Sequence, residues 1–220
     1  MSSDLTLVIG NRNYSSWSLR PWIFMTHVGL AFDTVCLPLD TPQFAAAIHS
    51  YSPAHRVPVL LHGALRVWES IAVIEYTAEL AGRGWPADRA VRAEARALAA
   101  EMHAGFQPLR DAYPMNIRAR GRSVPANPAL AASIRRIDTM WSDCRRRHAA
   151  GGPWLFGAYS GADAMYAPVA LRFNTYGSAG LSEAARAYVA TAVGDPLLQP
   201  WIAAATAEPE VIERDEAGHV

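Results

Sequence analysis

The sequence contains no lysine: all 20 of its basic residues are arginines, and 20 acidic residues balance them. A chain without net charge lacks the basic excess that attracts nucleic acids or anionic membrane surfaces, so we expect neither as a partner. Cysteine is scarce as well, with only Cys36 and Cys144 in 220 residues. Two cysteines so far apart indicate neither a disulfide framework nor a metal site, and we expect both thiols to be buried and unreactive.

Long apolar runs are also missing, although hydrophobic residues make up 51% of the chain. No uninterrupted stretch reaches the roughly eighteen residues that a membrane-spanning helix needs, and the N-terminus lacks the pattern of a secretory signal. The 7 histidines form no pair at metal-ligand spacing, and neither a glycine-rich phosphate loop nor a GxSxG motif occurs. We therefore expect a soluble, cytoplasmic protein without a bound metal.

The most informative stretch is YSSWSLR, residues 14–20, which follows an apolar run at 5–9 and a polar turn. The apolar run predicts a buried strand, and the serines then open a helix. The hydroxyls and the first N–H groups of that helix should face outward together, which would favour a carboxylate, a phosphate or a thiolate there. The alternative, which the residues alone leave open, is that Ser15, Ser16 or Ser18 simply caps the helix.

Up to about residue 80 the pattern indicates an α/β unit with a crossover between the first two strands. The predicted strands are 5–9, 32–37, 57–61 and 65–68, and the predicted helices follow Ser15, span 41–50 and span 71–80. Pro58 stands at the head of a strand, where it cannot donate to the ladder, so it is either an edge proline or a cis proline. Glu69 and Ser70 precede the last of these helices, where Ser70 either caps the helix or binds a ligand.

The rest of the chain reads as helical. Residues 82–87 resemble a linker, and we expect two domains, 1–81 and an all-α domain 88–220. The predicted helices of the second domain are 88 to about 119, interrupted or kinked at its prolines, then 128–148, 162–177, 182–193 and 196–207. The polar tail 208–220 should be frayed or only loosely docked.

The order of these features resembles the glutathione-binding domain of the cytosolic glutathione S-transferases: a βαβ unit, a serine at the first helix N-terminus, Val57-Pro58 before the third strand, and Glu69-Ser70 after the fourth. Residues 15–20, SSWSLR, align with the Ser-Ser-Cys-x-x-Arg motif of the zeta class, and a helix-capping box at 160–163 extends the resemblance to roughly residues 5–205. The resemblance implies an N-terminal thioredoxin-like domain, a C-terminal helical bundle, a cytoplasmic homodimer, glutathione as co-substrate and a role in detoxification.

The resemblance also assigns roles to individual residues. Ser15 would be catalytic, as a hydrogen-bond donor to the glutathione thiolate and not as a nucleophile. Val57-Pro58 would have a cis bond that turns the Val57 backbone toward the cysteinyl part of glutathione, while Glu69 and Ser70 bind the γ-glutamyl end. We assign the flanking residues His55 and Arg56 to the same glutathione site.

An electrophile pocket is expected between the two domains, lined by Trp17 and by one side of the long helix. The predicted lining residues are Trp17, Met102, Phe106, Arg110, Tyr113 and Asn116. Trp17 replaces the zeta cysteine, and Glu69 stands where zeta members commonly have glutamine. The retention of Ser15, Val57-Pro58 and Glu69-Ser70 together favours an enzyme, and we expect a glutathione transferase that stabilises the glutathione thiolate for attack on a small electrophile. The alternatives are a glutathione-dependent isomerase of the maleylacetoacetate type and a non-catalytic binding or scaffold protein.

Overall fold

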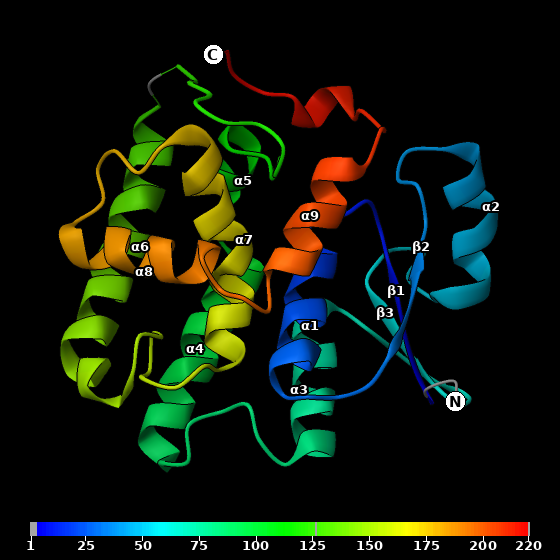
Figure 1. Ribbon diagram of the computed structural model, residues 1–220, viewed down its shortest axis with the longest axis horizontal. Helices are drawn as coiled ribbons and strands as arrows, with labels where there is room; N and C mark the ends of the chain where they lie inside the picture. Colours follow the sequence, from blue (N-terminus) through cyan, green and yellow to red (C-terminus); the bar gives the residue numbers. More distant parts are fainter. Residues whose placement is uncertain (1–3, 126, 220) are drawn as a thin grey trace.

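The computed structural model of the protein describes residues 4–125 and 127–219. Its N-terminal part is a thioredoxin-like unit, as predicted (Figure 1). The elements of this unit are β1 (Leu5–Ile9), α1 (Ser16–His27), β2 (Asp33–Cys36), α2 (Pro42–Tyr51), β3 (Val59–His62), β4 (Leu65–Trp68) and α3 (Ser70–Ala81). The strands lie in the order β2-β1-β3-β4, with β2 parallel to β1 and the other two pairs antiparallel.

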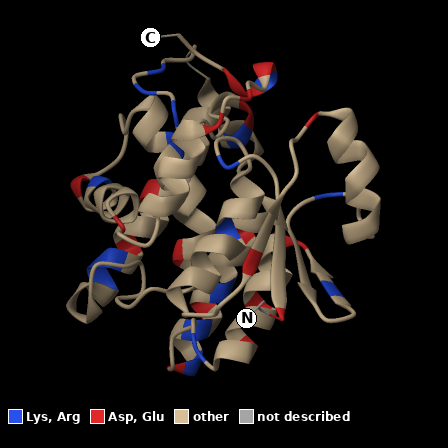
Figure 2. Cartoon of the chain, turned by 45° about the vertical axis from the view of Figure 1, so that its right-hand side comes forward, with Lys and Arg blue, Asp and Glu red and all other residues tan. Residues whose placement is uncertain are grey.

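Alternation along the strands explains why the sheet is covered on both faces. Successive side chains of a strand point to opposite faces, so Leu7 and Ile9 share one face and Val8 occupies the other. Val8 packs with Ile48 of α2, whereas Leu7 and Ile9 belong to the larger core that includes α1 and α3. Accordingly, α2 lies on one side of the sheet and α1 and α3 on the other (Figure 1). Helix α2 carries no Lys, Arg, Asp or Glu (Figure 2).

The second unit is helical, again as predicted. It consists of α4 (Arg89–Ala104), α5 (Gln107–Ala112), α6 (Pro128–His148), α7 (Gly161–Tyr176), α8 (Glu183–Val193) and α9 (Gln199–Ala207), with short 3₁₀ turns at Ala149–Gly151 and Glu213–Asp215. Helix α7 is its centre and is buried along nearly its whole length. The predicted capping box at its start is present, with the Asp163 carboxylate accepting hydrogen bonds from the Ser160 N–H and hydroxyl.

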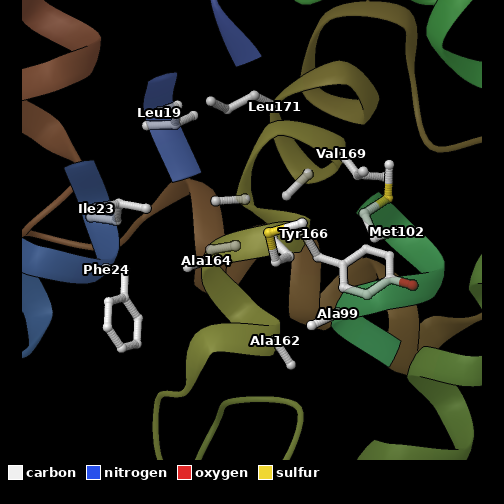
Figure 3. Packing of buried hydrophobic residues seen from close by; sticks show 14 of the residues in the cluster. Leu19, Ile23, Phe24, Ala99, Met102, Ala162, Ala164, Tyr166, Val169 and Leu171 are labelled. Atoms are coloured by element: carbon white, nitrogen blue, oxygen red, sulfur yellow. The ribbon is translucent and has the colours of Figure 1, made fainter. Parts of the chain in front are cut away.

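The two units share one hydrophobic core. Leu19, Ile23 and Phe24 on α1 face α7, while Ala99 and Met102 approach α7 from α4 (Figure 3). These five side chains are almost fully buried. Burial of each large apolar side chain among them contributes about 1.5–3 kcal/mol, so the position of α1 is fixed by the second unit as much as by its own sheet.

The helix expected from 88 to about 119 is interrupted next to Pro108, as its prolines predicted, but its second part ends at Ala112. Pro108 has no N–H to donate, and its ring would clash with the carbonyl of Ala104 in a continuous helix. Helix α4 therefore ends at Ala104, Phe106 adopts a left-handed conformation with φ 62°, and α5 starts at Gln107 with proline in its first turn. This break changes which side chains share a face.

Two other expectations were wrong, one for Cys36 and one for the tail. Cys36 is exposed, because β2 is an edge strand of the sheet, although Cys144 is buried as expected. The described part of the tail, residues 208–219, is docked against the body of the molecule and not frayed. In Figure 1 it runs from α9 across the top of the molecule. The side chains of Glu208 and Glu216 explain the docking, because they accept hydrogen bonds from groups that would otherwise lack partners.

Within the described residues, no helix has the length and apolar character needed to cross a membrane. The same residues contain no group of three His, Cys, Asp or Glu side chains arranged to hold a metal ion. Acidic and basic residues are interspersed along most of the chain (Figure 2).

Candidate functional site

The N-terminus of α1 places its serines at the meeting point of the two units. Ser15 is the N-cap residue, but its side chain makes no capping hydrogen bond, so the simple capping alternative does not hold for it. Instead the Ser15 hydroxyl donates to Ser18 Oγ at 2.7 Å, and Ser18 Oγ also accepts from the Gly10 N–H at 3.1 Å. These contacts fix the orientation of the turn that leads into the helix.

Ser16 is in contact with an arginine of the second unit. Arg172 of α7 donates through Nη2 to Ser16 Oγ at 3.3 Å and through Nε to the carbonyl of Tyr113 at 2.6 Å. Its Nη1 is buried and makes no hydrogen bond with the described residues. Burial lowers the pKa of Arg172 to about 10, which still leaves it cationic at neutral pH. A buried cation with a free donor therefore stands beside the serines.

Trp17 is held between two guanidinium groups. The carbon Cζ of Arg20 lies 4.2 Å from the centre of the indole, and that of Arg110 lies 4.4 Å from it. Such cation–π contacts are strongest where the cation is desolvated. Arg20 is fully buried, and its three guanidinium nitrogens make no hydrogen bond to the described residues. Burial, together with the charges of Arg110 and Arg172, lowers the pKa of Arg20 well below its usual value.

Tyr14 also lies at this turn, but its hydroxyl is already engaged. It donates to Glu216 Oε1 at 2.7 Å and accepts from Arg118 Nη2 at 2.8 Å. Burial, with a further contribution from Glu216, raises the pKa of Tyr14 above its usual value. A phenol of raised pKa whose proton is directed at a carboxylate is a poor donor to a thiolate. The Ser15 proton is directed only at a neutral hydroxyl, which a thiolate can replace as acceptor, so the geometry favours Ser15 for that task.

The N-terminus of α3 forms the second part of the site. Glu69 is the N-cap residue, with φ 68°, and its carboxylate is half exposed. Its Oε2 lies 3.5 Å from Nε2 of His103, whose pKa is lowered by burial and by the charge of Arg20. Ser70 begins the helix, and its buried hydroxyl makes no hydrogen bond with the described residues. One helix N-terminus thus carries a half-exposed carboxylate and a buried hydroxyl without a hydrogen-bond partner, although Ser70 itself lines neither of the cavities described below.

The Val57-Pro58 peptide bond is cis, in agreement with the prediction, and it lies between the two helix N-termini. Val57 lines both of the cavities found there. His55 and Arg56 precede it on the exposed loop, where His55 contacts His49 through Nε2 at 3.0 Å and the Arg56 N–H donates to Ser52 Oγ. Neither side chain is buried, so both are available to a ligand.

Two adjoining cavities connect these features. The larger, of about 560 Å³, lies at the N-terminus of α1, and the smaller, of about 210 Å³, lies at the N-terminus of α3. Residues Trp17, Arg56 and Val57 line both, so they form the shared wall. The predicted site residues that line at least one cavity are Ser15, Trp17, His55, Arg56, Val57, Pro58, Glu69 and Arg110. A peptide carrying an ammonium and a carboxylate could extend from Glu69 along Val57 to the serines.

Four predicted lining residues lie outside these two cavities. Met102 is fully buried in the core, and Phe106 packs against the same core at the break between the helices. Tyr113 stacks on Tyr176, with ring centres 4.5 Å apart. Asn116 is buried and hydrogen bonded to Asn13 and Glu216. We revise the predicted pocket accordingly.

Several residues that line the larger cavity were not predicted from the sequence. Arg172 could have been found, because it is the only basic residue of the mostly apolar helix α7. Arg214 and Asp215 come from the tail and line the cavity as well, and Arg214 pairs with Asp40 at 3.0 Å. No local pattern in the tail predicted this placement.

The comparisons with known proteins agree with this geometry. A family model described as the glutathione S-transferase N-terminal domain matches residues 14–80. No curated protein sequence matches the chain. A glutathione transferase homolog from Burkholderia, solved with bound glutathione, has a TM-score of 0.67 and 23% identity over 93% of this chain and 99% of its own. The tau-class glutathione S-transferase of mango, Mangifera indica, has a TM-score of 0.71 and 18% identity, covering 98% and 97% of the two chains.

A third similar structure is a bacterial zeta-class maleyl pyruvate isomerase, with a TM-score of 0.66 and 21% identity over 94% of this chain and 100% of its own. Similarity at such low identity establishes the fold. The chain has the fold of the glutathione S-transferases, and its residues 14–80 carry the sequence signature of their N-terminal domain.

Proposed function

We propose that the protein is a glutathione transferase that binds glutathione across the two helix N-termini and stabilises its thiolate for attack on a small electrophile. The observation that carries the proposal is the pairing of two helix N-termini: serines at the start of α1, and a half-exposed Glu69 carboxylate with an unpartnered Ser70 hydroxyl at the start of α3. The match of residues 14–80 and the glutathione bound in the Burkholderia homolog support it.

The chemical task of such a site is to ionise a thiol. A free thiol has a pKa of about 8.5, so only about 3% of it is thiolate at pH 7. A shift of about two units, roughly 2.7 kcal/mol, would make the thiolate the major form. We propose that the Ser15 hydroxyl supplies a hydrogen bond and the first N–H groups of α1 supply a positive potential. Glutathione itself is then the nucleophile, and the protein contributes thiolate stabilisation and proximity.

At the other end, we assign Glu69 to the γ-glutamyl ammonium and Ser70, with the N–H groups of α3, to the α-carboxylate. Among the described residues, the Ser70 hydroxyl has no hydrogen-bond partner. The Glu69 carboxylate has only the contact with His103, at 3.5 Å. A buried hydroxyl without a partner is costly, and a ligand carboxylate would relieve that cost. His55 and Arg56 would contact the exposed side of the same peptide.

A calorimetric titration with glutathione tests the proposal directly. We expect a dissociation constant in the micromolar to low millimolar range, and no comparable binding of the same tripeptide lacking its γ-glutamyl amine. Absence of binding at millimolar glutathione would refute the proposal and would favour a protein that keeps the fold as a scaffold.

A second candidate is a glutathione-dependent isomerase, and Arg172 is the observation that favours it. The arginine lines the larger cavity, is buried, and keeps one Nη group without a partner. Such a donor would suit an electrophile that carries a carboxylate, as the maleyl compounds do. Parallel assays with a neutral aryl halide and with an unsaturated dicarboxylate distinguish the two: turnover of the acid alone, lost in Arg172→Met, would establish the isomerase.

We also propose that the chain has two domains, with residues 82–87 as the linker between α3 and α4. We further propose that the protein is a cytoplasmic homodimer. The chain exposes large apolar side chains that a second copy could cover, among them Leu65 and Trp68 on the edge strand β4. Light scattering should give a mass twice that of the 23.9 kDa chain, and a mass of one chain at all concentrations would exclude the dimer.

A further inference from the structure

We infer that the C-terminal segment 208–219 is a positioning element for the serine turn, with Glu216 as its principal positioning residue. The inference rests on the proposed function, because it assigns the segment a role in the same thiol chemistry. It concerns the loop Gly10–Tyr14, which connects β1 to Ser15.

The loop is held mainly from the second unit. Glu208 accepts the backbone N–H of Arg12 through Oε1 at 2.7 Å and that of Asn13 through Oε2 at 3.0 Å. The Trp201 indole donates to the Arg12 carbonyl at 3.0 Å. Hydrogen bonds to a charged acceptor are about twice as strong as neutral ones, so the bidentate carboxylate is the main anchor of these two peptide groups.

Tyr14, the residue before Ser15, is held by Glu216. The carboxylate accepts from Tyr14 Oη at 2.7 Å, from Asn116 Nδ2 at 2.8 Å and from Arg122 Nη2 at 3.0 Å. The Asn116 amide oxygen in turn accepts from Asn13 Nδ2 at 3.0 Å. Glu216 is thus the common acceptor of a network that reaches the two residues immediately before Ser15.

This network controls the serines through the backbone. The Tyr14 carbonyl accepts the Ser16 N–H at 2.9 Å, and the Asn11 carbonyl accepts the Ser15 N–H at 2.8 Å. A displacement of the loop would therefore move both serine hydroxyls relative to the cavity. Because a misplacement of about 1 Å can reduce catalysis about 100-fold, loss of the Glu216 carboxylate should affect the chemistry more than the binding of glutathione.

Glu216→Gln tests the inference, with Glu213→Gln as its control. The amide of glutamine keeps the size of the side chain but removes the charge that three donors share. Glu213 lies in the same segment, and its side chain makes no hydrogen bond or ion pair with the described residues. In Glu216→Gln we expect hydrogen exchange of the 14–16 amides to be at least about tenfold faster, with the Arg12 and Asn13 amides, which Glu208 holds, less affected and α7 unchanged. Glu213→Gln should leave exchange unchanged.

The chemistry provides the second readout. In Glu216→Gln the pKa of bound glutathione thiol, followed by thiolate absorbance, should rise, and kcat should fall about tenfold while the dissociation constant of glutathione stays within about threefold. Tyr14→Phe removes a single hydroxyl from the network and should produce smaller changes in the same direction. It serves as the informative variant if Glu216→Gln does not fold.

The outcomes separate the two proposals. Faster loop exchange together with a raised thiol pKa supports the positioning role. Wild-type exchange and a wild-type thiol pKa in both variants would overturn it, even if the protein is a glutathione transferase. If the wild-type protein does not bind glutathione, the proposed function fails, and the exchange measurement alone still decides whether the segment holds the loop.

Discussion

The two helix N-termini of the site are prepared in opposite ways. At α1 the hydroxyls already have partners: Ser15 donates to Ser18, and Ser16 accepts from Arg172. At α3 the Ser70 hydroxyl is buried without a partner, and the Glu69 carboxylate is half exposed. Both ends have the positive potential of a helix N-terminus, so the dipole does not explain the difference.

The difference corresponds to two tasks. A group that stabilises a developing charge must be fixed before the reaction, because reorganisation at that moment raises the barrier. A group that only binds can remain unsatisfied until the ligand arrives, at a cost to the stability of the free protein. We therefore place the thiol chemistry at the N-terminus of α1, the rigid end of the site, and the recognition of glutathione at the N-terminus of α3. Substitutions at the two ends can test this division.

The largest expected effect is on turnover in Ser15→Ala. Loss of one hydrogen bond directed at the thiolate should lower turnover with a generic aryl halide by roughly ten- to a thousand-fold. Glutathione affinity should stay within a few-fold, because the contacts at α3 remain. The pH dependence of turnover and of thiolate absorbance measures both quantities.

Ser16→Ala is the matched control for this experiment. It removes an equally buried hydroxyl from the neighbouring position. If Ser16→Ala abolishes activity and Ser15→Ala does not, the donor is Ser16, assisted by Arg172. If neither matters, the rigid end of the site has no role in thiol chemistry.

At the other end, Glu69→Gln should show the reverse pattern. Loss of a charged partner for the γ-glutamyl ammonium costs about 1.5–3 kcal/mol, which corresponds to roughly ten- to a hundred-fold weaker binding of glutathione. The kcat at saturating glutathione should remain near the wild-type value. Glu79→Gln, on an exposed part of the same helix, controls for the general loss of a negative charge. A fall in kcat with unchanged affinity would contradict the division of tasks.

The pH dependence of glutathione binding provides a smaller effect at the same end. Burial and the charge of Arg20 lower the pKa of His103 below its ordinary 6.5, so its imidazole is neutral at pH 7. As the pH falls through the lowered pKa, the imidazolium that forms next to Glu69 competes with the ligand ammonium, with Arg110 as a further nearby cation. Glutathione affinity should therefore decrease a few-fold below pH 6.5.

In His103→Gln this decrease should be absent, and calorimetry between pH 5 and 8 measures it.

The same pKa shift makes the free energy of unfolding depend on pH. Between the lowered pKa of His103 and pH 6.5, the unfolded chain binds a proton that the folded protein does not. The contribution of His103 is complete above pH 6.5 and is lost as the pH falls. An unchanged pH profile in the variant would exclude His103 as the cause.

The smallest effects are those on stability, and they compare the two ends directly. Ser18 Oγ accepts hydrogen bonds from both Gly10 and Ser15, so Ser18→Ala should cost about 1–3 kcal/mol of unfolding free energy. Ser70→Ala removes a buried hydroxyl that has no partner, so its desolvation cost disappears and the unfolding free energy should rise by about 1 kcal/mol. Denaturant titrations of both variants without ligand measure this, and equal losses would contradict the comparison.

Much of the first unit was predictable from local patterns. The alternation around Leu7 and Val8, the serines before α1 and the Glu69-Ser70 pair before α3 depend on residues that are close in the chain, and each was found near its predicted position. The break at Pro108 also has a local cause, because proline cannot continue the helix. The positions of Phe106 and Asn116 outside the cavities, in contrast, depend on contacts with distant residues.

What local patterns could not provide were contacts between distant residues. Arg172 reaches Ser16, Arg110 covers Trp17, and Glu216 reaches Tyr14, and in each pair the partners are far apart in sequence. A polar tail contains no periodic apolar face, so its docking depends on acceptors that match donors elsewhere. Cys36 was misjudged for a similar reason, since the strand order makes β2 an edge.

The sequence by itself determined the order of helices and strands and the two helix N-termini, because hydrophobic periodicity and the serine and proline positions act over a few residues. Only the tertiary structure decided which hydroxyl has a partner, which arginine has none, and which tail carboxylate supports the turn before Ser15. These are properties of burial and of distances between remote residues. They arise only when the two units pack α1 against α7 in one core.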